Sequence, residues 1–172
     1  MIQAARILAE AAAVYDDKNA AESCSYGPEA RGNASCAEIV ISDEAIDCPR
    51  VDSIDILVAL TQEAYDKSCE CLKPDGVIIT DDNVKIDDRN KELMQYSVPL
   101  LSIAEARLGK ASMINILALG FLSAFCPVVE KKSICEAILA RVPRMSEDAY
   151  MEAFDIGRET AEELAGTIKG QT

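Results

Sequence analysis

The most restrictive feature of this sequence is a strand–helix–strand pattern in its middle third. Residues 54–60, IDILVAL, form a near-continuous apolar run, which is typical of a parallel strand covered on both faces. Thr61 can cap a helix over 62–72, the turn at 73–76 contains proline and glycine, and 77–80 supply a second strand. Such a crossover joins parallel strands and is right-handed in almost every known case. The pattern therefore predicts an α/β fold with a mostly parallel sheet.

Apolar patterns on both sides of this unit predict further elements. Residues 2–15 carry a narrow polar stripe at Gln3, Arg6 and Glu10, which is typical of a helix lying against a sheet. With 172 residues and a hydrophobic fraction of 49%, we expect one domain over 1–172 with a helical C-terminal part. The remaining expected elements are strands at 20–25, 36–42 and 96–100, and helices at 103–108, 113–126, 133–142 and after Ser146.

The residues that follow the first predicted parallel strand are Thr61, Gln62 and Glu63. They fall at the carboxyl edge of the sheet, where open α/β folds place ligands and partner contacts. They can equally be a plain helix start, with a carboxylate that complements the helix dipole. A second polar group follows the next strand and matches no calcium-loop spacing, so a solvated loop is favoured over a magnesium site. Its members are Asp81, Asp82, Asn83, Asp87 and Asp88.

The least regular stretch is the loop from 25 to 35, SYGPEARGNAS. Its proline fixes φ, and its glycines and asparagine tolerate positive φ, so the backbone turns more than once. Glu29 and Arg31 lie between these turns. They can form a solvated surface pair, or they can present a carboxylate and a guanidinium to a ligand or partner. The candidate contact residues of this loop are Tyr26, Gly27, Pro28, Glu29, Arg31, Gly32, Asn33 and Ser35.

The charge of the chain argues against several classes of partner. It has 30 acidic and 17 basic residues, a formal net charge of −13, so nucleic acids and anionic membrane surfaces are poor partners. An acidic electron carrier would also be repelled and should dock on another protein. The most apolar run, 113–126, is shorter than the ~20 residues that cross a bilayer. Without a secretory signal pattern, we expect a cytoplasmic protein.

The reactive residue types argue against a self-contained active site. The chain has no histidine, which removes the usual general base and a common zinc ligand. Its seven cysteines are odd in number and contain no C-x-x-C pair, as expected in a reducing compartment. We therefore expect no catalytic residue and no metal site on this chain.

Four segments give the chain a family resemblance. The strongest is 25–32, SYGPEARG, followed by Ala34 and Ser35. The others are the strand 37–41 with Ser42-Asp43 after it, LVALTQEA at 57–64, and 115–120 in the apolar helix. Together they resemble the gamma component of the 2-oxoacid:ferredoxin (acceptor) oxidoreductases, the group that acts on pyruvate, 2-oxoglutarate and 2-ketoisovalerate.

The resemblance implies a three-layer Rossmann-like domain in a complex that oxidatively decarboxylates a 2-oxoacid, of the 2-oxoglutarate or pyruvate type, to an acyl-coenzyme A. Such a complex uses thiamine diphosphate, magnesium, iron–sulfur clusters and coenzyme A, and passes electrons to ferredoxin or a similar acceptor. This chain would hold none of these cofactors alone. Its partners would be the alpha and beta subunits, with a delta subunit in some complexes, and ferredoxin only indirectly.

The chain departs from the family pattern in two places. Members of the family usually begin with a strand and a glycine-rich turn, and the first helix comes after them. In this sequence Met1 already belongs to that helix. We therefore expect the first strand to be missing. Asn33 stands where a glycine is usual, a mild change because asparagine tolerates positive φ.

Three roles remain open at this level. Arg31, held by Glu29, can contact the coenzyme A side of the active centre. Alternatively, the two candidate loops can be purely structural contacts with sister subunits. An independent nucleotide-binding protein is disfavoured because the sequence has no G-x-G-x-x-G or Walker turn. An isolated chain could self-associate through the apolar surface that its partners would cover.

Overall fold

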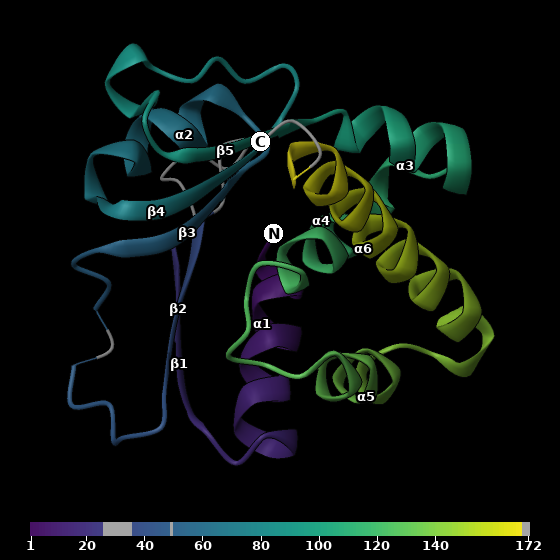
Figure 1. The fold of residues 1–172 in the computed structure, drawn as a ribbon. Helices are drawn as coiled ribbons and strands as arrows, with labels where there is room; N and C mark the ends of the chain where they lie inside the picture. The colour runs from purple at the N-terminus through teal and green to yellow at the C-terminus, as the bar shows by residue number, and fades with distance from the viewer. Residues whose placement is uncertain (26–35, 49, 170–172) are drawn as a thin grey trace.

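The computed structural model of the protein describes residues 1–25, 36–48 and 50–169. Figure 1 shows the arrangement of its elements. The strands are β1 (Asn19–Ser25), β2 (Cys36–Ser42), β3 (Ile54–Ala59), β4 (Leu72–Asp81) and β5 (Met94–Val98). The helices are α1 (Ile2–Glu10), α2 (Gln62–Ser68), α3 (Leu100–Leu108), α4 (Ile114–Ser123), α5 (Lys131–Arg141) and α6 (Glu147–Lys169).

The strands β3, β4 and β5 form a parallel sheet in that order. α2 connects β3 to β4, so the predicted strand–helix–strand unit is confirmed, and Thr61 caps the helix as expected. The helix is shorter than the predicted 62–72. It ends at Ser68, a short 3₁₀ turn follows, and β4 begins at Leu72. The reason is Pro74, which disfavours helical backbone at the residue before it.

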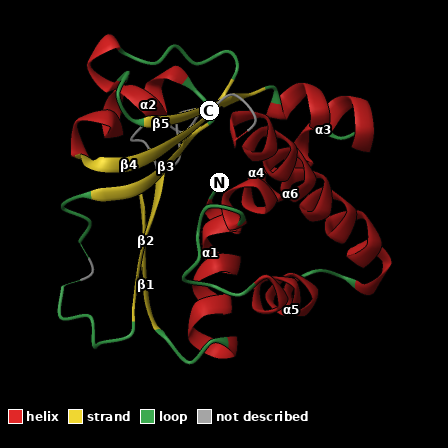
Figure 2. Cartoon of the chain, in the orientation of Figure 1, coloured by secondary structure: helices red, strands yellow, loops and turns green. Residues whose placement is uncertain are grey.

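Helical or irregular elements cover both faces of this sheet (Figure 2). α2 and the connection from β4 to β5, residues 82–93, lie on one face, while α3, α4 and α6 lie on the other (Figure 1). Leu57 and Ile78 point to the first face, and Ile79 and Val98 to the second. The expected three-layer α/β architecture and the helical C-terminal part are therefore confirmed.

The strands β1 and β2 form a separate antiparallel hairpin. Its register runs from Asn19 opposite Ser42 to Ser25 opposite Cys36. α1 packs on one face of this hairpin and continues as a short π-helical turn, Ala11–Tyr15. The expected strands at 20–25 and 36–42, and the expected packing of the first helix against strands, are confirmed.

The helices α4 and α6 cross in unusually close contact at two glycines. A Cβ atom added to Gly120 would lie 2.0 Å from the carbonyl oxygen of Phe154 in α6. A Cβ atom added to Gly157 would lie 2.0 Å from the carbonyl oxygen of Leu117 in α4. The backbones of the two helices therefore touch, which requires glycine at both positions. The apolar run predicted as a buried helix forms this crossing.

The boundary between β5 and α3 differs from the prediction. The strand was expected at 96–100, but it lies two residues earlier, and α3 begins at Leu100 rather than at residue 103. Pro99 has φ −75° and directly precedes the first residue of α3. Proline has no backbone N–H, and at the start of a helix this group would have no intrahelical partner, so its loss costs little. The side chain of Asp81 accepts a hydrogen bond from the N–H of Leu101, at 3.0 Å, which stabilises the earlier start.

Asp16 joins the first and last thirds of the chain. Its carboxylate accepts a hydrogen bond from the N–H of Glu130 at 2.7 Å and another from the hydroxyl of Ser133. It thereby caps the start of α5 from a position far away in the sequence. Among the described residues, no helix combines the length and the apolar character that spanning a bilayer requires.

Candidate functional site

The predicted candidate residues Thr61, Gln62 and Glu63 lie at the start of α2. Thr61 has extended backbone, and its hydroxyl accepts a hydrogen bond from the N–H of Ala64 at 3.3 Å. Glu63 lies in the first turn and forms an exposed ion pair with Lys67, at 2.6 Å. These contacts are those of a well-capped helix start, one of the two alternatives that the sequence left open.

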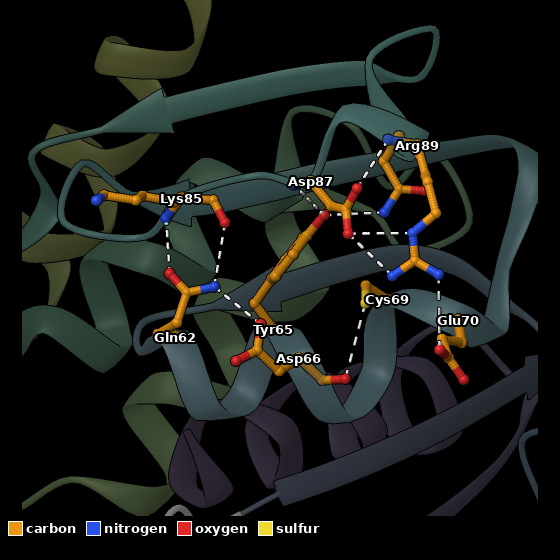
Figure 3. A network of polar contacts seen from close by, with 9 residues as sticks. Gln62, Tyr65, Asp66, Cys69, Glu70, Lys85, Asp87 and Arg89 are labelled. Carbon is orange, nitrogen blue, oxygen red and sulfur yellow. Dashed lines mark hydrogen bonds and ion pairs between the residues drawn. The ribbon is translucent and has the colours of Figure 1, made fainter.

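Gln62 binds the neighbouring connection rather than pointing freely into solvent. Its carbonyl oxygen accepts a hydrogen bond from the N–H of Lys85 at 2.8 Å, and its amide nitrogen donates to the carbonyl of Lys85 at 3.1 Å. The same nitrogen donates to Asp66 at 2.9 Å (Figure 3). The side chain of Gln62 thus pairs with both backbone groups of Lys85, as a neighbouring strand would, in the connection 82–93. We call this connection the crossover segment.

Tyr65 fixes the crossover segment at a second point. Its ring is buried, with 1% exposure, and its hydroxyl accepts hydrogen bonds from the N–H of Asp87 at 3.0 Å and from the side-chain amide of Asn90 at 2.9 Å. Sequence reasoning missed this residue. The sequence signal for Tyr65 was a tyrosine within the predicted helix 62–72. A tyrosine in that place is equally typical of an ordinary core residue.

Arg89 lies between the crossover segment and the 3₁₀ turn Cys69–Cys71 that follows α2 (Figure 3). Its guanidinium donates to Asp87 at 2.9 and 3.1 Å and lies 3.8 Å from the carboxylate of Glu70. The side-chain bond from Arg89, followed by its backbone N–H bond, lowers the pKa of the Asp87 carboxyl from its usual value. The same partner raises the pKa of Arg89. The Asp87–Arg89 pair lies within the crossover segment, and both partners are solvent-accessible, so its contribution to stability is small.

The acidic group after β4 is divided by the fold. Asp81 is 3% exposed, and its carboxylate accepts bonds from Leu101 and from the amide of Asn83, the latter at 2.7 Å. Asp82 is exposed. The described residues contain no cluster of three or more histidine, cysteine, aspartate or glutamate side chains that could hold a metal ion. The buried carboxylate at this edge is a cap for α3.

The predicted 25–35 loop lies almost wholly outside the described residues, so its contact residues, Tyr26 to Ser35, have no structural account. Its two ends are described. Ser25 and Cys36 pair at the end of the hairpin. Burial raises the pKa of the Cys36 thiol, Glu38 adds to this, and the nearby Lys67 of α2 opposes it. Cys36, at the described end of the hairpin, is therefore near enough to Lys67 of α2 to interact with it electrostatically.

An open hollow of about 590 Å³ lies between the hairpin and the segment that follows it. It is lined by Glu22, Ser23 and Glu38 from the strands and by Cys48, Arg50 and Asp52 from the segment that follows them. Glu22 is partly neutralised by Arg6, at 3.5 Å. The lining is exposed and mostly charged. Next to it, the Cys24 thiol donates a hydrogen bond to Glu22 at 2.8 Å, and this bond raises the pKa of the thiol and so disfavours the reactive thiolate.

Comparison with known proteins gives concordant matches in sequence and structure. The family model described as pyruvate ferredoxin/flavodoxin oxidoreductase matches residues 1–160. The 2-oxoglutarate synthase subunit KorC of Methanocaldococcus jannaschii is 43% identical over 166 residues, which cover 95% of this chain and 89% of that protein.

Two solved structures share the fold. The keto/oxoacid ferredoxin oxidoreductase gamma subunit of Geobacter sulfurreducens has a TM-score of 0.82 at 38% identity, over 94% of this chain and 91% of that one. The 2-oxoglutarate:ferredoxin oxidoreductase of Magnetococcus marinus, solved with 2-oxoglutarate, coenzyme A and succinyl-CoA bound, has a TM-score of 0.83 at 21% identity. This chain covers 29% of that longer protein, and the likeness shows the fold alone.

Proposed function

The chain belongs to the pyruvate ferredoxin/flavodoxin oxidoreductase family, and we propose that it is the gamma subunit of a complex that oxidatively decarboxylates 2-oxoglutarate. One observation carries this proposal. The 2-oxoglutarate synthase subunit of M. jannaschii and this chain match over nearly the full length of both. The gamma role is supported by the solved gamma subunit of G. sulfurreducens, which also matches almost end to end.

In the proposed reaction, 2-oxoglutarate loses carbon dioxide, its acyl group passes to the thiol of coenzyme A, and the released electrons pass to ferredoxin. Thiamine diphosphate, magnesium and iron–sulfur clusters would supply the chemistry of these steps. Among the described residues, no group of three or more histidine, cysteine, aspartate or glutamate side chains is placed to hold a metal ion or cluster, and the family resemblance places thiamine diphosphate on other components. We therefore assign these cofactors to sister subunits and assign no chemical step to this chain.

The proposed partners are the alpha and beta subunits of the same complex, together with a delta subunit where one exists. The formal charge of −13 supports a docking role toward less acidic subunits and disfavours direct docking of acidic ferredoxin on this chain. The proposed location is the cytoplasm.

We assign contact with coenzyme A, or with the subunit wall beside it, to Arg31 and its loop. Support comes from the sequence of the loop and from Cys36 at its end, which is near enough to Lys67 of α2 to interact with it electrostatically. An Arg31→Ala complex should assemble normally and show a raised Michaelis constant for coenzyme A. An unchanged constant in a normally assembled complex would exclude ligand contact and leave a role in subunit contact only.

The substrate assignment can be tested on the complete complex, purified by a tag on this chain. Reduction of ferredoxin should be measured with 2-oxoglutarate, pyruvate and 3-methyl-2-oxobutanoate, each with coenzyme A. We expect kcat/KM for 2-oxoglutarate to exceed that of the other acids by about 100-fold or more. A site that binds the second carboxylate of 2-oxoglutarate keeps unpaired polar groups when it holds an acid without that carboxylate. A preference for pyruvate would overturn the substrate and leave the gamma role standing.

A further inference from the structure

We draw no further inference here: the strongest candidate, the apolar surface patch at the edge strand β5, where the exposed Met94 contacts Tyr96 and the ring of Tyr96 lies beside that of Phe125, carries nothing because nothing in the structure shows what covers it.

Discussion

At the residue scale, the cysteines differ in how readily they can react. Burial raises the pKa of the Cys126 thiol, and also that of Cys69, whereas Cys48 and Cys71 are exposed. Since the thiolate is the reactive form, a raised pKa and poor access both slow alkylation. All seven cysteines are free thiols in the structure.

We expect iodoacetamide at neutral pH to modify Cys48 and Cys71 first and Cys126 last. Peptide mapping by mass spectrometry over a time course measures this order, with the denatured chain as the control in which all sites react at similar rates. Modification of Cys126 before Cys48 in the native chain would contradict the described packing.

The ionisation of Asp87 makes the Asp87–Arg89 pair in the crossover segment depend on pH. Arg89 lowers the pKa of its carboxyl, so the pair contributes stability that is present above the unfolded pKa of ~3.9 and is lost as pH falls through the lower folded value. We expect the crossover segment to loosen only below about pH 4. NMR titration of the Asp87 carboxyl measures this directly. In Arg89→Ala, its pKa should return toward the ordinary value, and an unchanged pKa in that variant would contradict the assigned cause.

At the element scale, the α4–α6 crossing is the most demanding contact. Alanine favours a helix over glycine by ~1 kcal/mol, yet Gly120→Ala or Gly157→Ala should lower the free energy of unfolding by about 2–3 kcal/mol. The reason is that each added methyl group would overlap a carbonyl oxygen of the other helix. Urea denaturation followed by circular dichroism measures the change.

Gly109 provides the matched control for this prediction. It has φ +64° and no atom within 4 Å of an added Cβ, so Gly109→Ala adds backbone strain of about 1 kcal/mol without steric overlap. A crossing variant that proved as stable as the wild type would show that α4 and α6 are not in backbone contact.

The elements with a clear local pattern were predictable from the sequence. The run at 54–60, the cap at Thr61 and the strand at 36–42 each have a local signal, and all three are confirmed. The errors lie at element boundaries. The early end of α2 has a local cause in Pro74, whereas the start of α3 is decided by a distant residue. α3 starts early because Asp81, from another strand, binds its first turn, and no local pattern encodes that contact.

The candidate site was predicted only in part for the same reason. Gln62 was singled out by its place after a strand, but its bonds to Lys85 arise from the fold. Tyr65 and Arg89 act through contacts with residues that are distant or irregularly spaced, so no motif marked them. The roles of Thr61, Gln62 and Glu63 in substrate or partner contact stay predictions, as do those of the 25–35 loop.

At the scale of the whole molecule, the chain combines a family-typical three-layer fold with a strongly acidic composition. Its net charge is −13, and its described residues gather no set of metal ligands. The role of the chain in binding and shaping its neighbours stays a proposal. The expectation of a single domain over 1–172 stays a prediction.

The central claim is that this chain is a gamma subunit on which 2-oxoglutarate oxidation depends. The most direct test is reconstitution of the purified sister subunits with and without this chain, with ferredoxin reduction measured in the presence of 2-oxoglutarate and coenzyme A. The account predicts that the chain alone is inactive and that adding it restores turnover, saturating at one chain per set of sister subunits. Full turnover without the chain, or turnover by the chain alone, would contradict it.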